Sequence, residues 1–266
     1  MTDTTEVRRV KSAVRTVELL EYLAARAEQP TRIRDVCAAL DMPRSSAHAL
    51  LRTLVAQGWV RSHEAGDDSG SLYSIGMRAL LVGTSYLDAD PYLPLIVPFL
   101  DDLRGQLDET CHLGRLDGHD VVYLATSESR HRTRHKVGRR LPAYATALGK
   151  SLLAERVGAE CDAHLPTELT PLTPRTVTDR AVLVSELDEI RVRGYATETE
   201  ENMVGIKCFA VTLRYRWPAS DAISASVPLA RLTPDREREI ITALQAVCDK
   251  AARVVRPVAN GDKWFA

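Results

Sequence analysis

The stretch IRDVCAALDMPRSSAHALLRTLVAQGWV, residues 33–60, decides the fold expected for the first part of this chain. Its opening turns predict a short helix with four inward-facing side chains, Ile33, Val36, Cys37 and Leu40. Thr31 is expected to cap that helix. Pro43 then predicts a tight turn and the start of a further helix, because proline suits the first helical position. Gly58 is expected to end this further helix, so two short helices follow one another.

The helix that begins at Pro43 has two distinct faces. Its inward face carries Ala47, Leu50, Leu51 and Leu54, and its outer face carries Arg44, Ser45, His48, Ala49 and Arg52. A slim polar face fits the major groove of DNA, because bulky side chains would hold the helix away from the base edges. We therefore expect base contacts from Ser45, Ser46 and His48. We expect phosphate contacts from Arg44 and Arg52.

The flanking segments complete a recognisable pattern. Residues 10–24 predict an amphipathic helix with one apolar stripe, Val10, Val14, Val17, Leu20 and Ala24. Residues 59–61 and 72–75 predict two strands joined by a polar turn at 65–70. Three helices followed by a hairpin are typical of a winged helix-turn-helix that binds double-stranded DNA. The alternative is an ordinary three-helix bundle, which the tandem helices, the proline start and the hairpin together disfavour.

Positive charge is concentrated in the same region. Residues 7–61 contain ten Lys or Arg against five Asp or Glu, a net charge of +5, although the whole chain carries −1. Phosphate binding requires a local positive face rather than a basic protein. The charge distribution is therefore compatible with DNA binding.

Composition excludes several other classes of protein. A chain of 266 residues with 45% hydrophobic and 27% charged residues is typical of a soluble globular protein with two domains. It has no apolar run of eighteen residues and its first residues do not resemble a signal peptide, so we expect no membrane association and a cytoplasmic location. The five cysteines are scattered without a CxxC pair or a Cys/His cluster, so neither a metal nor another cofactor is expected.

Five blocks in order resemble the IclR family of bacterial transcriptional regulators. They are VKSAVRTVELLEYLA at 10–24, the stretch 33–60, SLYSIGMRALLVG at 71–83, LPAYATALGKSLLA at 141–154 and RGYATETEENMVGIKCFAV at 193–211. The resemblance implies dimers that commonly associate into tetramers and that control neighbouring catabolic genes. Two departures concern the operator: the small Ala47 and Ala49 in the third helix, and the acidic turn with Asp67 and Asp68.

Beyond residue 90, strand-like and helix-like segments are interspersed. The expected strands are 110–116, 121–126, 132–137, 209–214 and 222–227, and the expected helices are 147–155, 182–193 and 234–253. An Asp117-Gly118 turn indicates that the first two strands form a hairpin. This order predicts an α+β fold with one antiparallel sheet. The resemblance implies that this part is a GAF-like effector-binding domain.

The expected domain boundaries follow from these segments. We expect a winged helix-turn-helix domain over 1–76, a linker helix over 77–90, the effector domain over 91–258 and a tail over 259–266. The linker helix is mostly apolar, through Met77, Leu80, Leu81 and Leu87. We expect it to pack against a second copy of the chain, as a homodimer or homotetramer, rather than within its own chain.

The effector site is expected at the start of a helix. Thr146 can cap the helix that follows it, and exposed amides there suit a carboxylate. The resemblance implies that the residues of this turn that contact a small-molecule effector are Ala147 and Leu148. It also implies a polar set of pocket residues, Glu198, Cys208, Ser224 and Ser226, with Thr133 and Leu141 lining the pocket. Ser224 and Ser226 are two apart on a strand and therefore share a face.

A basic run at 130–136 has two interpretations. It is either a solvated edge strand protected by charge, or a strand whose His131 and His135 help to bind an anionic effector.

Three functions are compatible with these patterns. The first is a repressor or activator whose DNA binding is controlled by a small organic acid. The second is a cysteine-dependent hydrolase with Cys208 as nucleophile and His112 as base, although no known catalytic motif is present. The third is a structural DNA-associated protein without a ligand.

Overall fold

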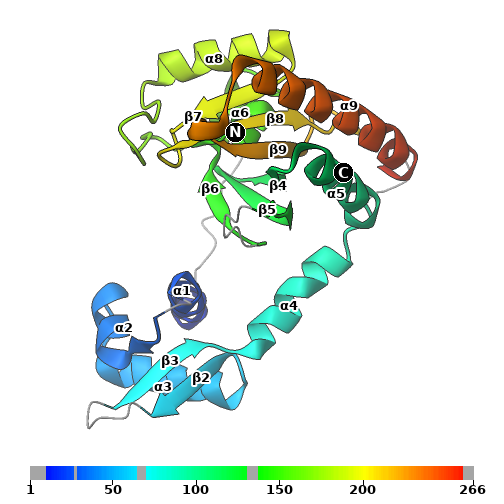
Figure 1. Cartoon of the computed structure of the whole chain (residues 1–266). Coiled ribbons are helices and arrows are strands. Elements are labelled where there is room, and N and C mark those ends of the chain that lie inside the picture. The colour runs from blue at the N-terminus through cyan, green and yellow to red at the C-terminus, as the bar shows by residue number, and fades with distance from the viewer. Residues whose placement is uncertain (1–9, 27–28, 65–69, 131–136, 260–266) are drawn as a thin grey trace, which may run out of the picture. The chain divides into compact units, whose positions relative to one another are not determined.

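The computed structural model describes residues 10–26, 29–64, 70–130 and 137–259. The chain divides into two compact units, Met1–Ala89 and Asp90–Ala266 (Figure 1). Each unit has its own core and is described separately below.

The first unit consists of three helices, a small sheet and a further helix. Its elements are α1 (Lys11–Ala25), β1 (Thr31–Arg32), α2 (Ile33–Ala39), α3 (Arg44–Ala56), β2 (Val60–Glu64), β3 (Ser71–Ile75) and α4 (Met77–Asp88). The sheet has the order β1-β3-β2, and both pairings are antiparallel. Helices α1 to α3 with the β2–β3 hairpin confirm the winged helix-turn-helix fold.

The core of this unit corrects the expected orientation of α1. Leu19 and Leu23 are buried, whereas Val10 and Val17, from the predicted apolar stripe, are 64% and 54% exposed. Helix α1 carries apolar residues on two sides, and the side facing Val36 of α2 and the buried residues of α3 is the one that packs. Periodicity alone cannot decide between two apolar sides of one helix.

The expected cap of α2 is also wrong. Thr31 lies in β1, where it pairs with Tyr73 of β3. The helix begins after Arg32, whose backbone N–H donates to the Asp35 carboxylate at 3.2 Å. Thr31 therefore forms a strand pair instead of the expected helix cap.

The second unit is built around one six-stranded antiparallel sheet in the order β6-β5-β4-β9-β8-β7. Its strands are β4 (Thr110–Asp117), β5 (Asp120–Ser127), β6 (Arg140–Pro142), β7 (Ala196–Thr199), β8 (Ile206–Thr212) and β9 (Asp221–Pro228). Its helices are α5 (Leu93–Leu107), η1 (Ala143–Ala145), α6 (Ala147–Leu153), α7 (Ala159–Asp162), α8 (Arg180–Arg193), η2 (Leu229–Arg231) and α9 (Pro234–Ala259). The α+β fold expected from the sequence is confirmed.

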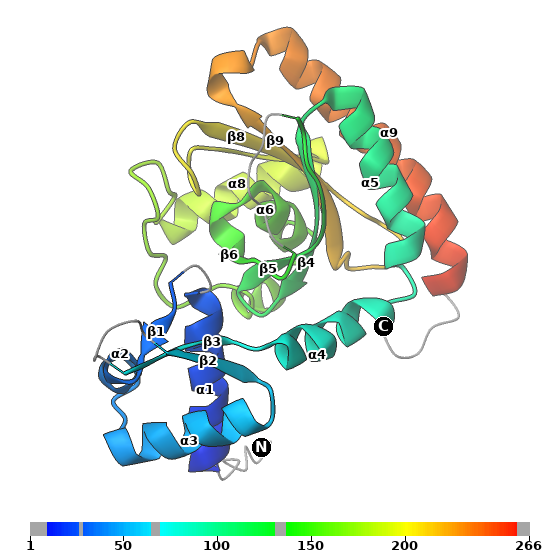
Figure 2. The same ribbon diagram turned by 60° about the horizontal axis from the view of Figure 1, so that its bottom comes forward.

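Helices cover both faces of this sheet. Figure 2 shows α5 and α9 on one side and α6 with α8 on the other. On the α6 side, Gly114 of β4 allows a close approach, since a Cβ atom there would lie 2.6 Å from Val121 Cγ1 and 3.0 Å from Leu148 Cδ1. The α6 face of the sheet is the face that carries the polar residues considered below.

The hairpin expected at Asp117-Gly118 is present, with Asp117 of β4 paired to Asp120 of β5. Gly118 adopts a φ of +60°, which glycine tolerates best. The strand expected at 132–137 lies outside the described residues except for Val137, which is in a turn. Within the described part of the chain, every helix is too short or too polar to cross a membrane.

Candidate functional site

Helix α3 presents a polar face to solvent. Arg44, Ser45, His48 and Arg52 are all exposed, while the opposite side of the helix is buried through Ala47, Leu51 and Leu54. Arg44, His48 and Arg52 are four residues apart and therefore form one row along the helix. The row presents two guanidinium groups and one imidazole without obstruction from the first unit.

Ser46 has a different environment from the other predicted contacts. It is half-buried, and it lies one turn before the half-buried Leu50. Successive residues are rotated by about 100° around a helix, so Ser46 is directed away from the row of Arg44, His48 and Arg52. Ser45 borders that row and is exposed.

In the second unit, strand register brings three predicted pocket residues into one line. Glu198 of β7 pairs with Cys208 of β8, and Cys208 pairs with Ser226 of β9. The Cys208 Sγ and Ser226 Oγ atoms are 3.3 Å apart. Directly paired residues project to the same face of a sheet, so these three side chains line one strip of the α6 face.

A second polar line runs beside the first. Ser224 of β9 pairs with His112 of β4, and His112 pairs with Thr126 of β5. The His112 Nδ1 and Thr126 Oγ1 atoms are 3.1 Å apart, and the imidazole stacks on the Tyr123 ring at a centroid distance of 4.5 Å. The sequence reasoning missed Tyr123 and Thr126 and considered His112 only as a base. Alternation along β4 was a signal for His112, but it would place Tyr123 and Thr126 on opposite faces of β5. A register shift between β4 and β5 at Leu113/Gly114 brings both to the side of His112, and no sequence pattern indicated it.

Burial controls the charge of this face. Burial raises the pKa of Glu198 to about 7, although hydrogen bonds from Cys208 and from the backbone N–H groups of Glu201 and Asn202 oppose the rise. Burial and the nearby Glu198 carboxylate raise the pKa of the Cys208 thiol well above its usual value. A thiol that stays protonated at neutral pH is a poor nucleophile. In addition, β9 lies between the strands that carry Cys208 and His112.

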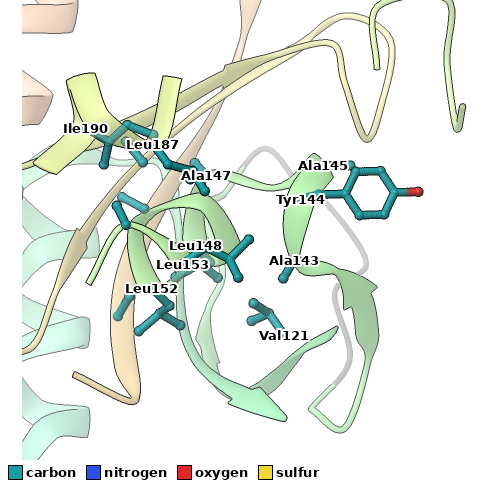
Figure 3. Packing of buried hydrophobic residues seen from close by; sticks show 14 of the residues in the cluster. Val121, Ala143, Tyr144, Ala145, Ala147, Leu148, Leu152, Leu153, Leu187 and Ile190 are labelled. Atoms are coloured by element: carbon teal, nitrogen blue, oxygen red, sulfur yellow. The ribbon is translucent and has the colours of Figure 1, made fainter. Parts of the chain in front are cut away.

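The start of α6 forms the wall above this face. Ala147 and Leu148 are buried, and the Thr146 hydroxyl accepts a hydrogen bond from the Gly149 N–H at 3.0 Å, which confirms the expected cap. Figure 3 shows Leu148 near Val121 and Ala143 in the same apolar cluster. Leu141 is also buried there, through its pairing with Val121.

Three residues considered for the ligand lie outside the described part of the chain, namely Thr133, His131 and His135. Among the described residues, no group of three or more His, Cys, Asp or Glu side chains could hold a metal ion.

Comparisons with known proteins assign both units to the same protein family. The family model described as the IclR helix-turn-helix domain matches residues 12–64, and the one described as the bacterial transcriptional regulator IclR C-terminal matches residues 84–253. The chain is 31% identical over 227 residues to the HTH-type transcriptional regulator XynR of Escherichia coli K12, covering 84% of this chain and 87% of XynR. It is 30% identical over 260 residues to the transcriptional repressor IclR of the same organism, covering 95% of this chain and 91% of the repressor.

Solved structures agree with these sequence matches. The crystal structure of the Thermotoga maritima IclR covers 93% of this chain and 100% of its own, with a TM-score of 0.70 and 26% identity. An IclR homologue from Microbacterium hydrocarbonoxydans, crystallised with 4-hydroxybenzoate, covers 92% and 99% with a TM-score of 0.74 and 22% identity. The second match supports the fold alone.

Proposed function

The chain belongs to the IclR family of bacterial transcriptional regulators, and from this premise we propose that it binds an operator through α3 and a small organic acid through the α6 face of its sheet. The observation that carries the proposal is the match of both family models, in order, to a unit with an exposed polar helix and a unit with a buried polar face. Proteins of this family are regulators rather than enzymes, so the hypothesis of a hydrolase based on Cys208 is wrong.

On the DNA side, we assign base reading to Ser45 and His48 and phosphate contact to Arg44 and Arg52. Ser46 is included among the base contacts, with the smallest expected share because it is half-buried. The short side chains of Ser45 and Ala49 let the helix approach the base edges closely.

On the ligand side, we assign polar contacts to Glu198, Cys208, Ser224 and Ser226 and apolar contacts to Leu141, Ala147 and Leu148. Thr133 keeps its predicted place in the pocket lining, although it lies outside the described residues. Because Glu198 has a pKa raised to about 7, it can be neutral beside a bound carboxylate and donate a hydrogen bond to it. We therefore infer that the effector is a small carboxylate.

We further propose that two copies pair through α4. No residue of α4 is buried, and Met77, Leu80 and Leu81 are 73%, 64% and 66% exposed. Such an apolar surface marks an interaction site. A two-fold dimer would place two copies of α3 on two operator half-sites, and a tetramer would combine two such dimers. The protein acts in the cytoplasm, where it meets the chromosome.

The proposal is tested with the full chain and the DNA upstream of its own gene. Fluorescence anisotropy should give a tight complex with that DNA and a weaker one with scrambled DNA of equal length. Adding the acid that binds should change the affinity, because it must bind the free and DNA-bound arrangements unequally. Binding that does not differ between the two DNAs at any salt concentration contradicts the operator proposal. DNA binding without any calorimetric signal from a panel of carboxylates supports a DNA-associated protein without a ligand.

A further inference from the structure

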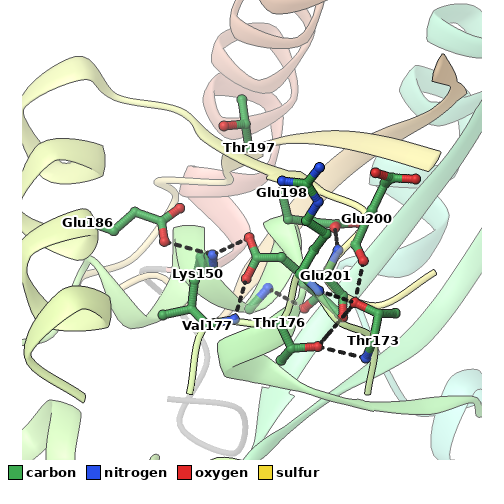
Figure 4. Close-up of polar contacts among 12 residues, drawn as sticks. Lys150, Thr173, Thr176, Val177, Glu186, Thr197, Glu198, Glu200 and Glu201 are labelled. Atoms are coloured by element: carbon green, nitrogen blue, oxygen red, sulfur yellow. Dashed lines mark hydrogen bonds and ion pairs between the residues drawn. The ribbon is translucent and has the colours of Figure 1, made fainter. Parts of the chain in front are cut away.

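Lys150 is a fully buried lysine whose charge is matched by two carboxylates. It lies on α6 with none of its surface exposed. Its Nζ atom is 2.7 Å from Glu186 Oε2 of α8 and 2.6 Å from Glu201 Oε1, in the segment between β7 and β8 (Figure 4). Burying such charges costs several kcal/mol per ion and is offset only by good geometry. The arrangement is therefore better explained by what it positions than by added stability.

The segment that Lys150 contacts is fixed at several further points. The Glu201 carbonyl accepts a hydrogen bond from Thr176 Oγ1 at 2.7 Å, and the Glu200 carbonyl accepts one from Thr173 Oγ1 at 2.6 Å. The ion pair of Lys150 with Glu201 joins this segment to α6. The hydroxyl groups of Thr173 and Thr176 hold the backbone of the segment. The Glu201 side chain is held by Lys150 and, at 3.4 Å, by the Val177 N–H, which donates to Oε2.

Glu201 in turn orients Glu198. The backbone N–H of Glu201 donates to Glu198 Oε2 at 2.9 Å. The Glu198 side chain also interacts with Cys208, and its charge raises the pKa of both Cys208 and Tyr123. The position of Glu201 therefore influences the orientation and the charge of the carboxyl group at the end of the polar strip.

Lys150 consequently joins two sides of the proposed ligand site. Helix α6 brings Ala147 and Leu148 to the α6 face of the sheet, and Lys150 follows them by less than one turn. From there the contacts run through Glu201 to Glu198 on β7. Neither step requires Lys150 to reach a ligand.

We propose that Lys150 is a positioning residue of the effector site, which holds Glu198 in its ligand-binding orientation through Glu201. The inference rests on the proposed ligand site, because it concerns the residue that presents Glu198 to that site. The titratable groups that act on Glu198 are Glu201 and Cys208 of β8, and Glu198 acts in turn on Tyr123 of β5. Arg139 also acts on Tyr123, His112 of β4 stacks on the Tyr123 ring, and Lys150 and Glu186 lie beyond Glu201.

The first test needs no ligand. The carboxyl group of Glu198 is titrated by ¹³C NMR in full-length protein labelled at glutamate, with Glu198→Gln used for assignment. In Lys150→Met the midpoint should rise, because Glu198 loses the backbone hydrogen bonds that lower its pKa. If Lys150 acted only through the charge of Glu201, the midpoint would fall, since Glu201 would then be protonated and its repulsion removed. An unchanged or lowered midpoint overturns the proposal.

Two further variants test whether Lys150 acts on Glu198 through the position of Glu201 or through its charge, and whether misfolding explains the result. Glu201→Gln keeps an acceptor for Lys150 and should not raise the midpoint. Lys150→Met combined with Glu201→Gln leaves no unpaired charge at Glu201, so it should fold even if the single variant Lys150→Met does not. Its Glu198 midpoint should lie above that of Glu201→Gln alone. Lys207→Met is the matched control: Lys207 pairs with Glu237 of α9 at 2.7 Å, and it should leave the midpoint of Glu198 unchanged.

The second test uses a ligand. Calorimetry is performed with 4-hydroxybenzoate and a panel of other small carboxylates, and the tightest binder is kept as the probe. Lys150→Met should weaken its binding by roughly tenfold, because a hydrogen bond to an ionisable group is misaligned. Glu201→Gln and Lys207→Met should stay within about twofold. If no acid binds the unaltered protein, the proposed ligand class fails while the NMR titration still decides the role of Lys150. If an acid binds all variants equally, the inference about Lys150 fails alone.

Discussion

The two candidate sites of this protein are built in opposite ways. The residues proposed to face DNA, Arg44, His48 and Arg52, come from one helix, and their exposure depends on helical spacing. The residues proposed to face a ligand, Glu198, Cys208 and Ser226, come from three strands and are aligned by their register. A surface that meets a long duplex can be supplied by one correctly packed element. A site that encloses a small molecule requires an entire unit to fold around it.

The largest effect on stability should come from adding a side chain where α6 packs against η1. A Cβ atom on Gly149 would lie 2.1 Å from the backbone oxygen of Ala143, a distance that requires the backbone to move. Gly149→Ala should therefore destabilise the second unit by more than about 3 kcal/mol. Hydrogen exchange with mass spectrometry should show faster exchange across β4 to β9 and unchanged exchange in α1 to α3.

The matched control for this variant is Gly83→Ala. Gly83 lies in α4 with no atom within 4 Å of an added Cβ, and alanine is the better helix former by about 1 kcal/mol. It should leave exchange in the second unit unchanged. Equal exchange patterns in the two variants would show that crowding at α6 does not govern the ligand-binding unit.

The next effect is a pH dependence of stability at Glu198. Its pKa is raised from 4.5 to about 7 in the folded protein, so the folded state keeps a proton that the unfolded chain loses between these values. Wild-type stability should therefore fall as pH rises through this window, by roughly 3 kcal/mol at most. Glu198→Gln lacks this proton. Urea unfolding of the second unit at pH 5 and pH 8 should favour the glutamine variant more at pH 8, and parallel profiles contradict the burial effect.

The sequence could predict the fold because local patterns decided most of it. Pro43 and Gly58 bracket α3, and Asp117-Gly118 joins β4 to β5. The prediction failed at α1, where two apolar sides were available and tertiary packing chose Leu19 and Leu23. It also failed at Thr31, which strand pairing removed from its expected role as a helix cap.

The ligand site was predictable only in part. The residues proposed to line it come from the family resemblance, and alternation explains why Ser224 and Ser226 share a face. Lys150 was missed because a single lysine in a helix usually points to solvent. Its partners Glu186 and Glu201 are 36 and 51 residues away, so no local pattern connects them. The residues that support a site are harder to find from sequence than the residues that line it.

The smallest predicted effect is a change in DNA affinity, and it should distinguish base contacts from phosphate contacts made by α3. His48→Ala should weaken binding to the operator by about 1–2 kcal/mol and leave binding to scrambled DNA nearly unchanged, because a base contact distinguishes sequences. Arg52→Ala should weaken both by similar amounts and reduce the salt dependence by about one phosphate contact, because backbone contacts carry no sequence information. Anisotropy titrations across salt concentrations measure both quantities, with the exposed Thr53→Ala on the same helix as the control. If His48→Ala lowered the two affinities equally, His48 would be a phosphate contact, and the row Arg44, His48 and Arg52 would position the helix without reading sequence.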